Sequence, residues 1–524
     1  MKKKYHNIYS PLIDTIELAG PDILKEFEAK SKDDNNKNLL VLPREMIGVL
    51  GRSKKQGSFG AEDFLRALDE VRINEAESTE NYNVYNMMDR LDVAFVKGVG
   101  LISDYSAFEK RINEFWEAVD NDGSWGNRPK FISNDSSVRV DLKDRGLAVD
   151  KPGFLLHDES IVKKGVIVAS NKFAEKIFSS PKGLSLDEAV DLLNPVDGAL
   201  YPNQFVKIRG DSPRYARVVG DLKRSSNGKI IGYDNPRVVL LNDQEYNKKV
   251  RVGSVVRDNV LGVSAWDMEQ YLAFQYGLFN DDVELFFMTG GAGSGKTLLS
   301  YVSVIDQVLW YDSSIAKARG YGVDGKGEQV RYKFKQIVLL KPNNLIGKDR
   351  DIGFLPGSMY DKLESHLMPF IDAHEECVLD EFFGFEDLLS HPKRDTSQFK
   401  KRPDIPKING EAYLSPKLPV FRMTYSGVMR GRSFSDTMIV VDEGENFTPY
   451  EMKTICGRVG MGSKLLVLGD PAQIDNPLCT RDVNGLTHAI KHYLPMAYSA
   501  LIHLPKNYRS QLSEDSNAWN VYSH

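Results

Sequence analysis

The segment Gly290-Gly-Ala-Gly-Ser-Gly-Lys-Thr297 decides the fold class of the C-terminal half of this chain. It fits the pattern G-x-x-x-x-G-K-[ST], whose glycines let backbone N–H groups surround a phosphate at the start of a helix. The apolar run VELFFM (283–288) before it predicts a strand, and TLLSYVSVIDQVLW (297–310) after it repeats apolar residues with helical spacing. Strand, loop and helix in this order favour a phosphate-binding loop over a plain glycine-rich turn.

The residues of this loop are the expected contacts of a nucleotide. Lys296 would bring its charge to the β- and γ-phosphates of ATP, and Thr297 would offer its hydroxyl to Mg²⁺. The remaining contacts would come from the backbone. The predicted nucleotide-binding residues of the loop are Gly290, Gly291, Ala292, Gly293, Ser294, Gly295, Lys296 and Thr297.

Acidic residues end the apolar strand MIVV (438–441). Asp442 would complete the Mg²⁺ shell, and Glu443 would polarise the attacking water, although an acidic pair at a strand end is also a common surface feature. The next strand ends in GDPAQ (469–473), where Gln473 would contact the γ-phosphate or the water, unless the segment is only a strand-to-turn exit. Because open α/β sheets bind ligands at the carboxyl ends of their strands, we expect these residues to converge on the loop.

The chain divides into three regions, 1–195, 196–257 and 258–524. The first alternates strands with helices, which predicts an α/β layer domain with a helical tail. The second contains short apolar runs about ten residues apart, which predict a small all-β module. The third has continuous apolar runs that fit a parallel sheet covered on both faces. Two polar segments of the third region, 313–333 and about 375–411, are expected to be insertions.

Composition restricts the cellular setting and the partners. The formal net charge of this 524-residue chain is −5, so any nucleic-acid contact must come from local basic patches. The three cysteines, Cys377, Cys456 and Cys479, lack metal-ligand spacing and indicate a reducing compartment. We find neither a signal peptide nor the roughly 18 apolar residues of a membrane helix. We therefore expect a cytoplasmic protein without a membrane partner.

Five segments of the third region resemble the PhoH family of ATPases. They are GGAGSGKT (290–297), KPNNLIGKDRDIGFLPG (341–357), RGRSF (430–434), VVDEGENFTPYEMKTICGRVG (440–460) and LVLGDPAQIDNP (466–477). The resemblance implies a single RecA-like ATPase core related to superfamily-one helicases, with ATP and Mg²⁺ as cofactors. It also implies a homo-oligomeric ring, expected to be a hexamer. Two departures are Glu445 within DEGEN, where the family has DEAQN, and Lys341 in place of an arginine.

An arginine is expected to complete the ATP site. A single RecA-like core leaves one face open, so a neighbouring subunit could supply an arginine finger. The candidates in this chain are Arg432, Arg458 and Arg509.

The first region resembles a diverged PIN nuclease domain in LIDT (12–15), NLLVLP (38–43) and FISNDSSVRVDLKDRGLAV (131–149). The order of the regions, with NPVDGALYPNQFVKI (194–208) between them, resembles PIN–PhoH fusion proteins. That resemblance implies RNA unwinding and RNA cleavage.

Asp14, Glu109 and Asp135 are the candidate carboxylates of a PIN metal site, which would hold Mg²⁺ or Mn²⁺. Each could instead be an ordinary surface or capping residue, and SND (133–135) after a strand fits a helix N-cap equally well. The acid that the family has after NLLVLP falls near Gly48 and Val49, with Glu45 one turn earlier. The sequence therefore leaves the activity of the nuclease open.

The resulting hypothesis is an ATP- and Mg²⁺-dependent motor acting on RNA, expected to be a helicase, joined to a PIN-type ribonuclease. One alternative is an ATPase switch or scaffold that regulates RNA without unwinding it, and another is a motor whose PIN region only binds RNA. The segment HPKRDTSQFKKRPDIPK (391–407) holds six Lys or Arg and two Asp. It could follow a phosphate backbone or form a solvated loop.

Overall fold

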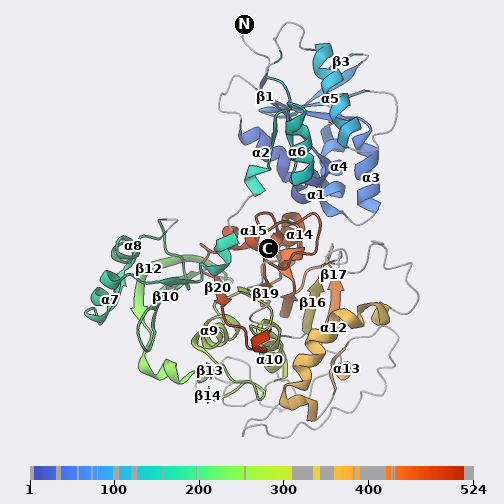
Figure 1. Ribbon diagram of the computed structural model, residues 1–524. Helices are drawn as coiled ribbons and strands as arrows, with labels where there is room; N and C mark the ends of the chain where they lie inside the picture. Colours follow the sequence, from blue (N-terminus) through green and yellow to red (C-terminus); the bar gives the residue numbers. More distant parts are fainter. Residues whose placement is uncertain are drawn as a thin grey trace.

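The computed structural model contains an N-terminal domain above a lower body made of a middle unit and an ATPase domain (Figure 1). The residues it describes are 5–30, 37–55, 58–71, 75–79, 81–97, 105–119, 125, 127–155, 159–195, 198–252, 255–309, 334, 336–342, 359–381, 384–389, 421–425, 429 and 431–512. No helix within these ranges has both the length and the apolar character needed to cross a bilayer.

The N-terminal domain is built on a seven-stranded sheet of order β3-β4-β5-β2-β1-β6-β7. Its strands are β1 (Tyr5–Pro11), β2 (Lys37–Pro43), β3 (Glu75–Ser78), β4 (Tyr82–Met88), β5 (Leu91–Val96), β6 (Lys130–Ile132) and β7 (Val149–Asp150). Its helices are α1 (Ile13–Ala19), α2 (Asp22–Ala29), α3 (Met46–Lys55), α4 (Phe59–Val71), α5 (Tyr105–Val119) and α6 (Ser136–Asp144). Two 3₁₀ turns, η1 (Gly153–Leu155) and η2 (Glu159–Lys163), follow them.

The central strands of this sheet are parallel and buried along nearly their whole length. β1 pairs with β2 and β6, and β2 pairs with β5, all in parallel. Every residue of β5 is buried, as are six of the seven in β2. Burial on both sides of a strand requires cover on both faces of the sheet. The α/β class predicted for this region is therefore confirmed.

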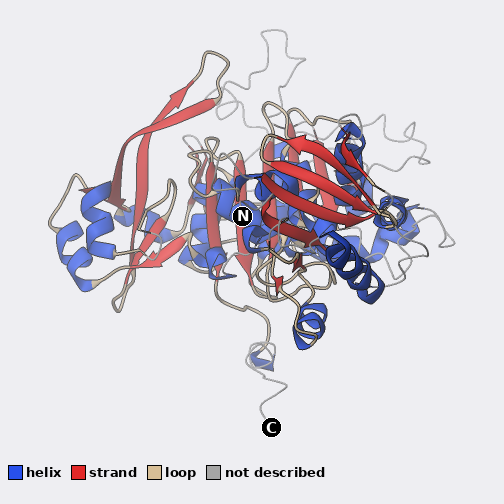
Figure 2. Cartoon of the chain, turned by 90° about the horizontal axis from the view of Figure 1, so that it is seen from above, coloured by secondary structure: helices blue, strands red, loops and turns tan. Residues whose placement is uncertain are grey.

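The middle unit is a five-stranded sheet of order β8-β10-β11-β12-β9, with two helices packed on it. Its elements are β8 (Val166–Val168), α7 (Asn171–Phe178), β9 (Leu184–Ser185), α8 (Leu186–Leu193), β10 (Phe205–Ile208), β11 (Arg214–Arg224) and β12 (Ile230–Leu240). η3 (Asp243–Asn247) and the hairpin of β13 (Val250–Val252) and β14 (Val255–Arg257) follow. Figure 2 shows the long hairpin of β11 and β12 projecting from the body.

This unit begins earlier than the predicted boundary at residue 196. β8 pairs with β10 and β9 pairs with β12, so two of the five strands come from the segment that we assigned to the helical tail of the first domain. α7 and α8 are amphipathic, and their buried Phe173, Ile177 and Ala189 join the core beneath this sheet. The tail therefore belongs structurally to the middle unit.

The ATPase domain has a six-stranded parallel sheet of order β17-β16-β18-β19-β15-β20. The strands are β15 (Leu285–Gly290), β16 (Gln336–Lys341), β17 (Phe421–Tyr425), β18 (Thr437–Val441), β19 (Lys464–Gly469) and β20 (Ser499–Leu504). The helices are α9 (Met268–Leu272), α10 (Lys296–Leu309), α12 (Met359–Glu375), α13 (Phe385–Leu388), α14 (Pro449–Cys456) and α15 (Gly485–Tyr493). Shorter turns are the π-helix η4 (Ala273–Leu278), and η7 (Val378–Glu381) and η10 (Gly444–Asn446).

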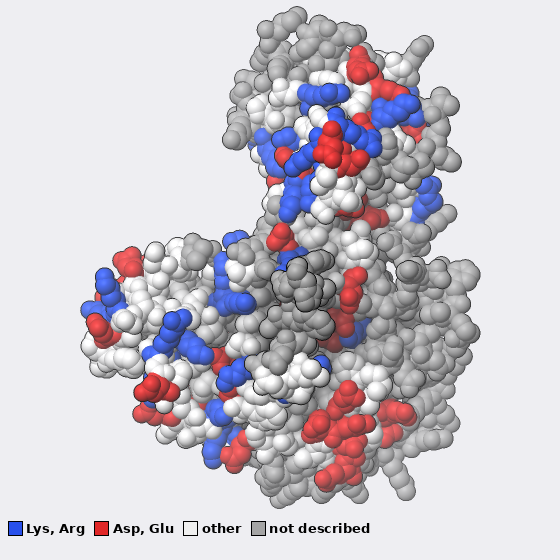
Figure 3. Space-filling view, in the orientation of Figure 1, with Lys and Arg blue, Asp and Glu red and all other residues white. Residues whose placement is uncertain are grey.

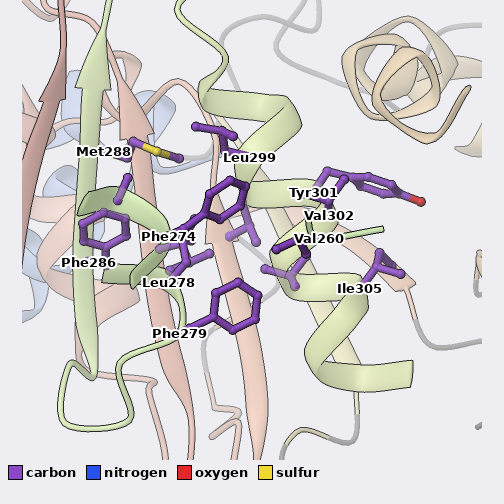
Figure 4. Packing of buried hydrophobic residues seen from close by; sticks show 14 of the residues in the cluster. Val260, Phe274, Leu278, Phe279, Phe286, Met288, Leu299, Tyr301, Val302 and Ile305 are labelled. Atoms are coloured by element: carbon purple, nitrogen blue, oxygen red, sulfur yellow. The ribbon is translucent and has the colours of Figure 1, made fainter. Parts of the chain in front are cut away.

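Apolar packing fixes the phosphate loop to this sheet. Phe274 and Leu278 of η4, Phe286 of β15 and Leu299 of α10 lie in one buried cluster (Figure 4). All residues of β15, β18 and β19 are buried, which confirms the predicted parallel sheet covered on both faces.

The two expected insertions fall largely outside the described residues. Residues 313–333 are not described, and neither are 390–411. The part from 375 to 389 belongs to the core instead, because Leu379, Phe385 and Leu388 are buried in it.

The N-terminal domain rests on the side of the ATPase domain formed by α14 and α15 (Figure 1). The Tyr450 hydroxyl donates to Asp63 Oδ2 at 2.6 Å, and Lys453 pairs with Asp22. Val483 lies in the hydrophobic core of the N-terminal domain. The helix that follows the acidic turn of the ATPase domain is thus in direct contact with the N-terminal domain.

Candidate functional site

The phosphate loop joins β15 to α10 at the carboxyl end of the sheet. Gly293 and Gly295 have φ values of 76° and 92°, which residues with a side chain adopt only with strain. A Cβ at Gly293 would also lie 2.3 Å from Asn507 Oδ1 and 2.7 Å from Arg509 Cγ. The tight path of the loop therefore depends on glycine at these positions.

Lys296 lies at the centre of this loop. Its Nζ donates to the backbone oxygens of Gly290 at 2.5 Å and Gly291 at 2.9 Å. Burial lowers the pKa of Lys296, and the carboxylates of Asp470, Glu445 and Asp442 oppose that shift. The buried hydroxyl of Ser294 has no hydrogen-bond partner. An ammonium bonded only to carbonyl oxygens and an unsatisfied hydroxyl fit a loop that binds phosphate oxygens.

Asp442 and Glu443 follow β18 and share one cation. The buried Nζ of Lys341, at the end of β16, lies 2.7 Å from Asp442 Oδ2 and 3.1 Å from Glu443 Oε1. Burial alone would lower the pKa of Lys341, but the two carboxylates outweigh it and raise that pKa. Burial raises the pKa of Glu443, against the effect of Lys341. Glu443 also has φ 56°, a left-handed conformation that a glutamate adopts at a cost.

Glu445 is the most deeply buried acid of the site. Its side chain is 3% exposed, and Oε2 accepts a hydrogen bond from the backbone N of Asp470 at 3.0 Å. Burial, with a smaller contribution from Asp442 and Glu443, raises the pKa of Glu445 to about 8. At neutral pH the group is therefore largely protonated and uncharged, as the glutamine expected at this position would be.

Gln473 lies beyond β19 but bonds to its own turn. Its Nε2 donates to Asp470 Oδ2 at 2.7 Å, and its backbone oxygen accepts from Asn446 Nδ2 at 3.5 Å. Asn446 Oδ1 also accepts from the backbone N atoms of Asp475 and Asn476, at 2.7 and 3.0 Å. These bonds tie the exit of β19 to the acidic turn after β18.

The three arginine candidates occupy two different places. Arg509 lies against Gly293 of the phosphate loop. Arg432 and Arg458 lie near the amino ends of β18 and β19, because Phe434 N donates to Arg458 O and Asp436 N to Met461 O. A five-residue strand is about 17 Å long, which separates these two from the carboxyl ends where the loop lies. Of these three arginines, only Arg509 lies beside the ATP crevice.

A second group of residues borders the phosphate loop and was not predicted as part of the site. Gln270 Nε2 donates to Ser294 O at 3.2 Å, while its Oε1 accepts from Trp266 N at 2.8 Å. The Tyr508 hydroxyl donates to Asp267 at 2.5 Å, and Tyr508 N donates to Gly293 O. The Trp266 ring is 64% exposed and meets Tyr508 edge-on at 4.9 Å. No contiguous motif joins these positions, so only the fold brings them together.

Asp14 and Asp135 are adjacent in the N-terminal domain. Asp14 Oδ2 accepts hydrogen bonds from Ser133 Oγ at 3.0 Å, Asn134 N at 2.6 Å and Asp135 N at 3.1 Å. Burial raises the pKa of Asp14, and these hydrogen bonds counteract it. Asp135 Oδ1 accepts from Ser137 and Val138, so it caps α6, and the hydrogen bond from the Ser137 side chain lowers its pKa. The N-cap interpretation of SND is thereby confirmed.

The structure does not bring Glu109 to these two residues. Glu109 lies on α5, and its Oε2 is 3.0 Å from Arg145 Nη1 at the C-terminal end of α6, whereas Asp135 caps the other end. The Arg145 guanidinium also pairs with Asp141 at 2.8 Å, one turn earlier, so Glu109 contacts the C-terminal half of α6. No local pattern around Glu109 indicates which end of α6 it contacts. Within the described ranges, no three His, Cys, Asp or Glu side chains form a metal-binding group.

Glu45 is better placed than Glu109. It follows β2, which neighbours β1, and Asp14 and Asp135 follow β1 and β6 on the same sheet. Both of its carboxylate oxygens are buried without a hydrogen-bond partner, and the nearest cation is Arg111 Nη2 at 3.6 Å. The acid expected after NLLVLP is thus present before α3 and not within it.

The basic segment 391–407 lies outside the described residues, so the structure does not test its role. On the face shown in Figure 3, lysines and arginines of the N-terminal domain and the middle unit are interspersed with acidic side chains.

Comparisons with known proteins relate this chain to PhoH-like proteins. The family model for PhoH-like protein matches residues 327–515. The chain is 27% identical over 387 residues to Protein PhoH2 of Bacillus subtilis (strain 168), which covers 73% of this chain and 70% of that protein. It is 30% identical over 194 residues to the PhoH-like protein of the same organism, 37% of this chain and 44% of the relative, so it spans less than half of that protein.

Among solved structures, the arterivirus nonstructural protein 10 (helicase) in complex with DNA matches 52% of this chain and 45% of its own. The identity is 14% and the TM-score is 0.17, so no structural argument rests on it. The family match and the phosphate-loop geometry together support an ATP-hydrolysing enzyme. The C-terminal region of this chain therefore matches the PhoH family model, and the chain is similar to PhoH2 over most of its length.

Proposed function

We propose that this chain is an ATP- and Mg²⁺-dependent motor that acts on RNA, with a PIN-type nuclease domain at its N-terminus. The main observation in support of a motor is that three strand ends converge on one crevice. Lys296 after β15, Asp442 after β18 and Asp470 after β19 are close enough for both carboxylates to influence the pKa of Lys296. Convergence of a cation loop and carboxylates at the carboxyl end of a parallel sheet is typical of nucleotide hydrolysis.

The proposed roles follow from these positions. Bound Mg²⁺ would neutralise phosphate charge, with Thr297 and Asp442 as its protein ligands. Lys296 would exchange its carbonyl partners, Gly290 O and Gly291 O, for phosphate oxygens. Glu443 would orient the attacking water and accept its proton, which requires release of its bond to Lys341.

Two further groups would control binding and coupling. Gln270 and the exposed Trp266 ring lie beside the loop, where the base of a nucleotide would stack and form hydrogen bonds. Gln473 would release its hydrogen bond to Asp470 and contact the γ-phosphate instead. Because Asn446 is bonded to the backbone oxygen of Gln473, this change would be transmitted to the turn after β18. Arg432 and Arg458 would serve the ATP site of a neighbouring subunit, which is why we propose a homo-oligomeric ring, with a hexamer as the expected form.

For the N-terminal domain we propose metal-dependent RNA cleavage at the sheet edge that carries Asp14, Asp135 and Glu45. A metal would have to draw these carboxylates together, because they do not form a metal-binding group among the described residues. These residues follow β1, β6 and β2, three neighbouring strands of one sheet. The buried oxygens of Glu45 lack a hydrogen-bond partner within the described residues, and their ion pair with Arg111 is long, at 3.6 Å, so a cation at this edge would offset the cost of burying the carboxylate. Carboxylates are the usual ligands of Mg²⁺ and Mn²⁺, which activate water for phosphodiester cleavage.

A second candidate function is an ATPase switch or scaffold whose PIN domain binds RNA without cleaving it. The observation that favours it is that Asp14 Oδ2 already accepts three hydrogen bonds. One oxygen of a proposed metal ligand is therefore occupied. In that case ATP turnover would control RNA binding through α14, which contacts the N-terminal domain through Tyr450 and Lys453.

One experiment separates these functions. ATP hydrolysis and strand separation are measured on the full chain with matched RNA and DNA duplexes that carry single-stranded tails. Stimulation of hydrolysis by RNA together with ATP-dependent separation supports the motor. If RNA stimulates ATP hydrolysis but the duplex is not separated, the switch is supported. If neither RNA nor DNA changes the rate of ATP hydrolysis, RNA is not the partner.

A further inference from the structure

A cavity of about 710 Å³ lies between the middle unit and the ATPase domain. β11 and β12 form one wall, and η4 with the turn before β15 forms another. Ala497, just before β20, also lines it, so the cavity is at the amino edge of the sheet, opposite the phosphate loop. Small-molecule sites have volumes of about 300–1,000 Å³ and occur preferentially between domains.

Arg217 lines this cavity without a carboxylate partner. Its Nη2 donates to Asn203 Oδ1 at 2.6 Å, and its guanidinium lies 4.3 Å from the centre of the Tyr276 ring. Its Nε is buried and has no hydrogen-bond partner. No ion pair joins Arg217 to an acid in the described part of the chain. Burial lowers its pKa against the weaker, opposing effect of Glu245 and Asp282, which are bonded to Tyr276 and Arg224 instead. A partly buried cation without a counter-ion is costly, and an anionic ligand would offset that cost.

Tyr233 supplies a second unsatisfied donor to the same cavity. Its hydroxyl is buried without a hydrogen-bond partner, and burial raises its pKa to about 12, so it remains a neutral donor. The ring lies over Gly220, where a Cβ would come within 2.6 Å of Tyr233 Cζ. Glycine at 220 is therefore needed for the position of this hydroxyl. A buried hydroxyl without an acceptor costs roughly 1–3 kcal/mol unless a ligand or water accepts from it.

We propose that Arg217 and Tyr233 bind the phosphate group of a phosphorylated ligand in this cavity. Phosphate oxygens only accept hydrogen bonds at neutral pH apart from one titrating site, so they match two donors without acceptors. The lining holds two arginines, Arg217 and Arg251, and two aspartates, Asp281 and Asp282. This balance favours a phosphate monoester over a polyphosphate. The monoester could be a free sugar phosphate or the terminal phosphate of a single-stranded nucleic acid.

The position of the site predicts an effect on ATP binding. Gln275 and Tyr276 of the cavity wall belong to η4, which continues directly from α9. α9 carries Gln270, whose side chain donates to Ser294 O of the phosphate loop. A ligand that orders this wall would thus alter the affinity for ATP by contacts that run through one continuous helix.

Calorimetric titration of the full chain tests the site with two probes, ribose 5-phosphate and a 5′-phosphorylated single-stranded RNA trinucleotide. Unphosphorylated ribose and the unphosphorylated trinucleotide serve as ligand controls. We expect at least one phosphorylated probe to bind the wild type more tightly than its control. Tyr233→Phe should weaken that binding about tenfold, as expected for one hydrogen bond to a charged group, and Arg217→Gln should abolish it. The probe that responds identifies the source of the phosphate.

Arg214→Gln is the matched control. Arg214 also has an Nε without a partner, but it pairs with Asp243 and does not line the cavity, so probe binding should be unchanged. If Arg217→Gln fails to fold, Tyr233→Phe alone decides, because it removes one oxygen and retains the ring. The proposal is overturned if neither phosphorylated probe binds, or if both cavity variants bind the probes as the wild type does.

Discussion

The ATP crevice and the N-terminal carboxylate site both lie where neighbouring parallel strands end, but their charges are arranged differently. In the crevice, Lys296 and Lys341 face Asp442 and Glu443. In the N-terminal domain, Asp14 Oδ2 accepts hydrogen bonds from two backbone N–H groups and the Ser133 hydroxyl, and no ion pair to Asp14 occurs within the described residues. The crevice, with cations and carboxylates together, suits a polyphosphate with its metal. In the N-terminal site, hydrogen bonds already stabilise part of the charge of the Asp14 carboxylate.

The largest expected effect concerns Lys296. Lys296→Ala should reduce ATP turnover on the order of 1,000-fold, because the loop loses the only side-chain charge that it directs at the phosphates. Turnover is measured by phosphate release. Lys229→Ala, in the exposed hairpin turn of the middle unit, is the control and should retain full activity. Normal turnover in Lys296→Ala would remove the basis for assigning the ATP site.

The second prediction separates binding from chemistry in the same crevice. Glu443→Gln should bind nucleotide with near-normal affinity but turn it over about 100-fold more slowly, as expected when a general base is lost. Equilibrium binding of a fluorescent ATP analogue and phosphate release are measured together. If binding and turnover fall in parallel, Glu443 supports the structure of the turn and does not act on water.

The third prediction addresses the N-terminal site. Asp135→Asn should reduce Mn²⁺-dependent RNA cleavage at least about tenfold, because a lost ligand or its hydrogen-bonded partner weakens the metal site by that order. Glu109→Gln is the matched control, since Glu109 pairs with Arg145 at the far end of α6 and should not affect cleavage. Cleavage is followed on labelled single-stranded RNA with Lys296→Ala in the background, which excludes contributions from the motor.

The opposite result would also be informative. If Glu109→Gln abolishes cleavage and Asp135→Asn does not, the site lies elsewhere in the domain. If wild-type protein cleaves no RNA with either metal, the N-terminal domain is an RNA-binding or structural module, and the two sites differ in kind as well as in charge.

The sequence predicted the crevice better than the carboxylate site for a physical reason. The phosphate loop and the pair Asp442–Glu443 are contiguous motifs, whose local backbone largely determines their geometry. Gln270 and Tyr508 reach the same loop from segments far apart in the chain, so no local pattern marks them. Glu109 belongs to no distinctive motif, and its place in the sequence does not determine which end of α6 it contacts.

The boundary of the middle unit illustrates the same limit. α7 and α8 were predicted as a helical tail because helical periodicity is local. Their assignment to a sheet depends on β8 and β9, strands of three and two residues that pair with distant partners. Strands this short carry almost no periodic signal of their own. The parallel sheet of the ATPase domain, by contrast, was predictable from its long continuous apolar strands.

The smallest expected effect concerns Glu445 of the crevice. Its ionisation should make the stability of the folded chain depend on pH. The pKa of Glu445 is about 8 in the folded chain, above the ordinary value of 4.5, so folding favours the protonated acid. Its contribution to stability is therefore fully present below about pH 4.5 and is lost as pH rises toward 8. Between these limits the slope approaches about 1.4 kcal/mol per pH unit. Glu445→Gln, which cannot ionise, should remove this part of the pH dependence.

The measurement is the thermal midpoint of wild type and Glu445→Gln between pH 5.5 and 8. The other acids of the crevice are present in both proteins, so only the difference between the two curves reports Glu445. We expect the thermal midpoint of Glu445→Gln to rise relative to that of the wild type as pH rises. ATP turnover at pH 6.5 should be unchanged, because the amide oxygen can still accept the hydrogen bond from Asp470 N. Parallel midpoint curves would show that Glu445 ionises without cost, and the amide-like role of this buried acid would then be wrong.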